Sequence, residues 1–149
     1  MNLGIKIFFI IVILTIIISQ KSFSHTNEPR HHAMVTLAKN MKEISRTIKS
    51  NSSFDDNFER KIYEVYEISK KLDYLFEEDD SSKEDSRASP EIWKNKDKFF
   101  SLTKDFEQSI ENLLQAVKNN DIEEMNNAIS RVGANCGKCH RSFRLPKKN

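Results

Sequence analysis

The spacing of the apolar residues is the feature that most constrains the fold of this chain. Between residues 34 and 48, apolar side chains recur every three or four positions, which places them along one face of an α-helix. Three further segments, 58–76, 99–117 and 122–143, show a similar helical period. The chain of 149 residues contains only three glycines and three prolines, and strand signals are poor. The pattern therefore predicts an all-α fold with four helices.

The connections between these segments predict how the four helices are arranged. Asn51-Ser52-Ser53 is expected to cap the second helix, and residues 119–121 separate the third helix from the fourth. The connection 77–90 is longer and acidic, and we interpret it as solvated and mobile. Pro146 is expected to end the last helix. Helices of about 20 residues joined by short, long and short connections predict an antiparallel four-helix bundle.

The N-terminal 24 residues have the composition of a leader. A short basic segment, 1–6, precedes the apolar run 7–18, and the small residues Ser22 and Ser24 follow at cleavage-site positions. The run is shorter than the roughly 20 residues that a membrane-spanning helix needs. We predict that residues 1–24 are a cleaved signal peptide and that residues 25–149 are one exported domain without a membrane span. An uncleaved N-terminal anchor is the alternative.

Charge excludes one class of partner. Lys6 and Lys21 lie in the predicted leader, so the remaining basic residues equal the 22 acidic residues in number. Both signs are interleaved along the chain, whereas nucleic-acid-binding proteins concentrate positive charge on one surface. We therefore expect no nucleic-acid partner.

A short cluster near the C-terminus holds the residues that carry chemistry. Cys136, Cys139 and His140 fall within five positions, on the apolar face of the last predicted helix. Residues three and four apart lie on the same side of a helix, so we expect all three side chains to be buried in the bundle. Such a cluster is compatible with a covalent haem, a zinc site, a redox dithiol or a disulfide.

The spacing favours one of these four. A redox dithiol needs a helix N-terminus, and this pair lies near a C-terminal end. Zinc needs four ligands, for which His31 or His32 would have to supply the fourth, and a disulfide between these cysteines would close almost no loop. Cys-x-x-Cys-His is the signature of covalent haem, in which the thiols bond the two vinyl groups and the histidine binds iron. The sequence therefore predicts one haem c, held by Cys136 and Cys139 with His140 on the iron.

Beyond the cluster, the sequence resembles the cytochrome c′ family, the class II c-type cytochromes, over essentially all of residues 25–149. The resemblance rests on Arg30-x-x-x-Met34, on 90-PEIW-93 and on 132-VGANCGKCHRSFR-144. It implies a four-helix bundle with one covalent haem near the C-terminal helix. The bacterial periplasm, where such haem is attached, agrees with the predicted export.

The resemblance also implies a role for Met34. In the family, the residue four positions after the arginine faces the distal side of the haem. A hydrocarbon or aromatic residue there leaves the iron five-coordinate, high-spin and able to bind nitric oxide, whereas a methionine, as in the cytochrome c556 type, is the sixth ligand of a low-spin haem. We therefore expect Met34 opposite His140, with His31 as an alternative ligand and Met41 as a core residue.

Further residues are candidates for the haem pocket. The resemblance implies that Arg144 lies beside the haem, and Arg30 could pair with a haem propionate; both could instead be surface charges. Trp93 and Phe99 are expected to be walls of the pocket or ordinary core residues. The full set of pocket candidates is Arg30, Trp93, Phe99, Phe143 and Arg144.

These observations predict a periplasmic monohaem electron carrier, which is not an enzyme. Its partners would be redox proteins, and it could form a homodimer through its first two helices, as family members often do. One alternative is a five-coordinate, high-spin cytochrome c′ that binds or sequesters nitric oxide or carbon monoxide. Another is a haem-free helical interaction module stabilised by zinc or a disulfide.

Overall fold

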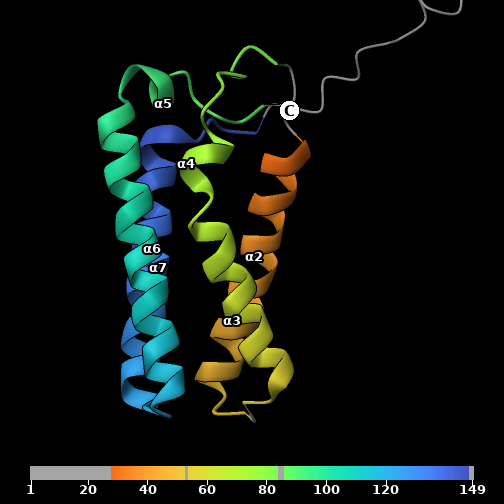
Figure 1. The fold of residues 1–149 in the computed structure, drawn as a ribbon, viewed down its shortest axis with the longest axis vertical. Helices are drawn as coiled ribbons and strands as arrows, with labels where there is room; N and C mark the ends of the chain where they lie inside the picture. The colour runs from red at the N-terminus through yellow and green to blue at the C-terminus, as the bar shows by residue number, and fades with distance from the viewer. Residues whose placement is uncertain (1–27, 53, 84–85, 148–149) are drawn as a thin grey trace, which may run out of the picture.

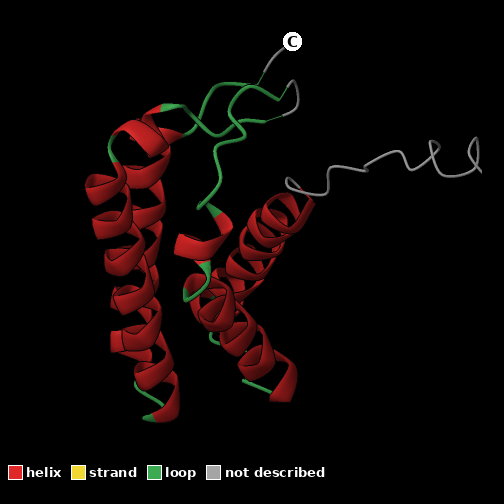
Figure 2. Cartoon of the chain, turned by 45° about the horizontal axis from the view of Figure 1, so that its top comes forward, coloured by secondary structure: helices red, strands yellow, loops and turns green. Residues whose placement is uncertain are grey.

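The computed structural model describes residues 28–52, 54–83 and 86–147, and the predicted signal peptide lies outside these ranges. The described residues form six helices, of which four are long and build an antiparallel bundle, as predicted (Figure 1). The helices are α2 (Glu28–Lys49), α3 (Asp56–Ser69), α4 (Leu72–Leu75), α5 (Glu91–Lys94), α6 (Lys96–Lys118) and α7 (Ile122–Phe143). The long connection between α4 and α5 crosses one end of the bundle (Figure 2).

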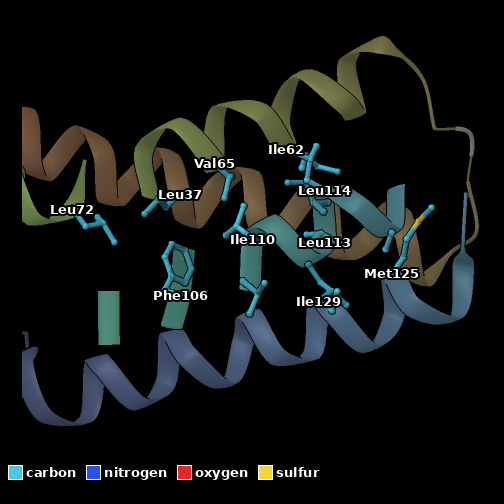
Figure 3. Packing of buried hydrophobic residues seen from close by; sticks show 14 of the residues in the cluster. Leu37, Ile62, Val65, Leu72, Phe106, Ile110, Leu113, Leu114, Met125 and Ile129 are labelled. Carbon is cyan, nitrogen blue, oxygen red and sulfur yellow. The ribbon is translucent and has the colours of Figure 1, made fainter. Parts of the chain in front are cut away.

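The apolar stripes of the long helices meet in one core. Ile44 of α2, Ile62 of α3, Ile110 of α6 and Val132 of α7 have no exposed surface. Figure 3 shows the side chains that pack between the helices, from Leu72 to Met125. Full burial of one such side chain stabilises the fold by about 1.5–3 kcal/mol. The helical period of the sequence is therefore the main determinant of the bundle.

Aspartates begin two of the long helices. The Asp55 side chain accepts a hydrogen bond from the Phe58 backbone N–H at 2.9 Å, and α3 starts at the next residue. The predicted cap at residues 51–53 was therefore wrong. Asn51 instead adopts a positive φ of 47° in the turn after α2, a conformation that asparagine tolerates better than most residues. Asp121 caps α7 in the same way as Asp55 caps α3, through the Glu124 N–H at 2.9 Å.

One predicted helix is interrupted, and a short helix that was not predicted precedes another. The segment 58–76 divides into α3 and α4, and the buried Ser69 hydroxyl donates to the Tyr66 carbonyl at 2.7 Å where α3 ends. The short helix α5 precedes α6, and Asn95 between them leaves the helical conformation with φ −127° and ψ 51°. These breaks turn the chain at the end of the bundle that the long connection crosses.

The last helix ends earlier than Pro146. Helix α7 stops at Phe143, and Arg144 is extended and forms an isolated β-bridge with Ala88. The Ser89 N–H donates to the Phe143 carbonyl at 3.0 Å, and the Leu145 N–H donates to the Arg87 carbonyl at 2.8 Å. The C-terminal segment is thus fastened to the long connection. Among the described residues, no helix combines the length and apolarity that crossing a membrane would need.

Candidate haem pocket

A cavity of about 440 Å³ lies at the end of the bundle that carries the long connection. Its walls come from the first half of α2, the first half of α6, the second half of α7 and residues 72–92. Most of the lining side chains are apolar, and they include Leu37, Leu72, Phe76, Phe99, Leu102, Phe106 and Phe143. The cavity therefore suits a large apolar group that needs a few polar contacts at its edge.

The predicted cluster lines this cavity, but it is less buried than expected. Cys136 and Cys139 are half-buried and His140 is exposed, although Val132, one helical turn before Cys136, has no exposed surface. The expectation that the cluster is buried in the bundle was wrong for His140, whereas the two cysteines are partly buried and pack against the core. The reason is that the second half of α7 faces the cavity, so its side chains lack a facing helix.

The surroundings of the cluster shift its pKa values towards the uncharged forms. Burial raises the pKa of the Cys136 thiol, and burial together with the Cys136 sulfur raises the pKa of Cys139 to about 11. The withdrawal of its ring from water lowers the pKa of His140, and the positive charges of Arg144 and Arg87 lower it further. A neutral imidazole is the form that binds a metal ion. Two thiols one helical turn apart and a neutral imidazole beside an apolar cavity are the donors that a c-type haem requires.

Helix α2 brings both candidate ligands, Met34 and His31, to the wall of this cavity, together with Met41. Met34 and Met41 are half-buried and His31 is exposed, and all three line the cavity that His140 also lines. Met41 also packs against the core, as predicted. The structure therefore brings Met34 and His140 to one cavity across some hundred residues of sequence, and it brings His31 there as well.

Arg30 is buried, and its partner was not foreseen. The residue is 7% exposed and forms an ion pair with Asp80, which is 3% exposed and also lines the cavity. The surface-charge interpretation of Arg30 was wrong, and so was the solvated interpretation of residues 77–90 where it concerned Asp80. Nothing in the local sequence marks Asp80, because it lies among other acidic residues and its partner is 50 positions away.

Of the remaining pocket candidates, some line the cavity and one packs behind the residues that line it. Phe99 and Phe143 are buried, line the cavity and form an edge-to-face pair with ring centroids 5.4 Å apart. Arg144 is exposed and borders the cavity. Trp93 does not border it; its ring lies 5.6 Å from the Arg30 guanidinium, and its indole N–H donates to the Phe76 carbonyl at 2.9 Å. Trp93 therefore supports the wall from behind.

The structure gives no support to zinc or a disulfide. Within residues 28–52, 54–83 and 86–147, no group of three or more His, Cys, Asp or Glu side chains is placed to hold a metal ion. Both cysteines are free thiols. The described residues therefore provide neither the zinc ligands nor the disulfide that the haem-free alternative requires.

Comparison with known proteins identifies the family. The sequence model of the family described as Cytochrome C′ matches residues 26–144. The chain belongs to the cytochrome c′ family. Proteins of this family bind a covalently attached c-type haem, so the predicted cofactor is confirmed.

Relatives of known sequence and structure agree with this assignment. A cytochrome c′ from Rhodopseudomonas palustris is 31% identical over 107 residues, which cover 71% of this chain and 72% of that protein. A cytochrome c-554 from Cereibacter sphaeroides is 36% identical over 61 residues, or 41% of this chain and 45% of that protein. A nitric oxide complex of a cytochrome c′ variant from Alcaligenes xylosoxidans superimposes with a TM-score of 0.72 at 22% identity, over 83% of this chain and 96% of that one. The cytochrome c′ from Rubrivivax gelatinosus gives 0.67 at 22% identity, over 77% and 91%.

The comparisons bear differently on the two haem functions. Cytochromes c′ are haem proteins of an electron-transfer and gas-binding family, and no catalytic activity is shown for this chain. Their haem is typically five-coordinate, which supports the gas-binding alternative better than the expected ligation by His140 and Met34. The residues that hold the haem in this chain stay predictions.

Proposed function

We propose that this protein is an electron carrier in which Cys136 and Cys139 hold one haem c, and His140 and Met34 bind its iron. The observation that supports this is that Met34 on α2 borders the same cavity as the three residues on α7. The Met34 thioether could therefore bind the iron of a haem in this cavity together with the imidazole of His140. Ligation by histidine and methionine raises the reduction potential and leaves no open coordination site, which suits electron transfer.

The residues of the chain would act by binding and by excluding water. When bound, haem c supplies a one-electron couple between ferric and ferrous iron. His140 offers an imidazole nitrogen whose pKa is lowered by partial withdrawal from water and by the charges of Arg144 and Arg87, which favours the neutral form that binds iron. Phe99, Phe106 and Phe143 keep water from the apolar side of the cavity, and a dry surrounding favours the ferrous state because it carries less charge.

A gas-binding haem protein is the second candidate. It is favoured by the comparisons, because cytochromes c′ typically have five-coordinate haem and several of the matching solved structures are nitric oxide complexes. In this case Met34 would be a packing residue of the cavity wall, as methionines on apolar helix faces often are. The iron would then keep one open site for nitric oxide or carbon monoxide.

Optical spectra of the haem-loaded protein test both candidates. We expect a low-spin spectrum with a sulfur–iron band in the oxidised state, and conversion to high spin with carbon monoxide binding in Met34→Leu. Met41→Leu is the matched control, because Met41 lies on the same helix and borders the same cavity; its spectrum should not change. A high-spin wild-type protein that binds carbon monoxide readily would favour the gas-binding candidate, and a low-spin spectrum retained in Met34→Leu would point to His31.

The proposed setting is the periplasm, with redox proteins as partners. Export and cleavage after residue 24 would give a mature chain that starts at His25. The mass of the secreted protein tests this start. A homodimer through α2 and α3 is part of the proposal, since family members often pair this way. Val35 on α2 is 51% exposed and Tyr63 on α3 is 45% exposed, so both helices carry apolar surface for such a contact. A sedimentation mass of one chain at micromolar concentration would contradict it.

A further inference from the structure

The most elaborate polar contact of the cavity wall is centred on Arg30. Its Nε donates to the Leu75 carbonyl at 2.7 Å, and its Nη2 donates to the Glu78 carbonyl at 3.1 Å. Its Nη1 donates to Asp80 Oδ1 in a charged hydrogen bond. The guanidinium thus fastens the start of α2 to the chain after α4, where it borders the cavity.

Aromatic rings hold the same guanidinium from its faces. Its carbon lies 4.5 Å from the Phe76 ring centroid and 5.6 Å from that of Trp93. Contact with ring faces favours a cation, and arginine makes such contacts with little loss of hydrogen bonding. The charge of Arg30 is therefore fixed in position beside the cavity, away from bulk water.

Asp80 is the only described carboxylate that pairs with this cation. Its Oδ1 accepts from Arg30 and lies 3.4 Å from the Ser86 hydroxyl, whereas its Oδ2 is buried and has no hydrogen-bond partner among the described residues. A carboxylate that is 3% exposed is tolerated only when a charge or several hydrogen bonds compensate it. The pair is thus nearly neutral as a whole, which leaves Arg30 little spare charge for a haem propionate.

We propose that the Arg30–Asp80 pair sets the electrostatic potential of the haem pocket, with Asp80 cancelling a fixed positive charge that would otherwise raise the reduction potential of the haem. A positive charge close to the iron disfavours the ferric state, which carries one more positive charge than the ferrous state, and a low-dielectric wall screens this effect weakly. We rest this inference on the haem that the family binds and on the contacts of Arg30 and Asp80. It does not depend on which residue is the sixth ligand.

If the Arg30–Asp80 pair only held the chain in place, its variants would change the potential in a different way. Removal of either partner would loosen the same contact between α2 and residues 75–80, so both single variants would lower stability and would shift the potential in the same direction. A pair that acts through charge gives opposite shifts, because one variant removes a cation and the other an anion. The sign of the shift therefore separates the two roles.

The experiment is a spectroelectrochemical titration of the haem-loaded protein at fixed ionic strength and a fixed, alkaline pH, where carboxylates stay ionised in the variants. We expect the midpoint potential to rise in Asp80→Asn, to fall in Arg30→Gln, and to return towards the wild-type value in the double variant. Arg30→Lys keeps the charge and should hold the potential closer to wild type than Arg30→Gln does, even where the loss of stacking lowers stability. Shifts of the same sign in Asp80→Asn and Arg30→Gln, or no shift in either, would overturn the proposal.

An exposed ion pair provides the matched control. Arg131 and Glu124 form a pair on α7 with side chains 48% and 42% exposed, and neither borders the cavity. Glu124→Gln should leave the potential unchanged, because solvent screens that charge. Spectra recorded in the same titrations report the spin state, and hence the ligand proposal, independently of the potential. A changed spin state in both single variants would also overturn the charge role, because it would show that the pair holds the ligands in place.

Discussion

Cys136 and Cys139 border the cavity one helical turn apart, and each is expected to form its own thioether bond to the haem. We predict that Cys136→Ser and Cys139→Ser each retain covalent haem at lower yield, whereas the double variant releases its haem into acidified organic solvent. In each single variant one vinyl group stays conjugated with the ring, so the α band of the pyridine haemochrome should move to longer wavelength. Haem staining on denaturing gels and the haemochrome spectrum measure both effects.

Lys138 supplies the control, since it lies between the two cysteines but is exposed and does not border the cavity. Lys138→Ala should keep the wild-type haem content and haemochrome spectrum. Covalent haem in the double variant would show that the attachment site lies elsewhere in the chain.

Single residues also show where prediction from sequence stops. Cys136, Cys139 and His140 could be predicted as a haem site because that chemistry depends on spacing within one helix, and Met34 could be predicted as a ligand because a family motif places it four residues after Arg30. These roles remain predictions. Asp80 could not be recognised, because its burial depends on an arginine 50 positions away. A pairing over that distance leaves no local sequence pattern. The acidic residues around Asp80 would by themselves predict a solvent-exposed segment.

Among the helices, α7 carries the proposed haem-binding residues at one end and its capping aspartate at the other. We predict that Asp121→Ala lowers the free energy of unfolding by about 0.5–2 kcal/mol, the usual cost of losing an N-cap hydrogen bond. The haem spectrum should not change, because the cap lies some five helical turns from His140. Denaturant unfolding followed by circular dichroism measures the loss.

Glu123→Ala is the matched control for the cap. It also removes an acidic side chain from the first turn of α7, but the described hydrogen bond to the helix backbone comes from Asp121. Its cost should therefore be smaller, close to the 0.3–1 kcal/mol typical of a charge near a helix end. Equal losses in the two variants would mean that charge, and not the cap hydrogen bond, stabilises this end.

The helical period predicted the long elements well and their interruptions poorly. Apolar spacing follows from burial against neighbouring helices, so it indicated α2, α6 and α7 nearly over their full lengths. It could not show that α3 ends at Ser69, since an apolar stripe continues through Leu72 and Phe76 into the cavity wall. The apolar stripe 122–143 ends where α7 ends, whereas Pro146 placed the end too late, because backbone hydrogen bonds to residues 87 and 89 draw the chain out of the helix first.

On the scale of the whole molecule, the bundle has two unlike halves. In one half, Ile48, Ile62, Leu113 and Met125 pack against one another with 1% exposed surface or less. In the other half, α2, α6 and α7 face the cavity, and the residues that would contact the haem replace helix-to-helix packing. The stability of the second half is therefore expected to depend on the cofactor, because a cavity of this size forfeits the contacts that its lining would otherwise make.

Removal of the cofactor tests this division. We predict that residues 25–149 produced in the cytoplasm, where no haem is attached, keep helix in the packed half and lose protection in the half that forms the cavity. Amides of α3 and of 125–132 in α7 should resist hydrogen exchange as in the haem-loaded protein, whereas those of 31–41 and 135–143 should exchange much faster. Helix content by circular dichroism should fall without vanishing, and Asp121→Ala should unfold the haem-free protein further, since its cap serves the half that remains. Uniform exchange along all four long helices would contradict the prediction, because it would show that the bundle folds or opens as one unit whatever occupies the cavity.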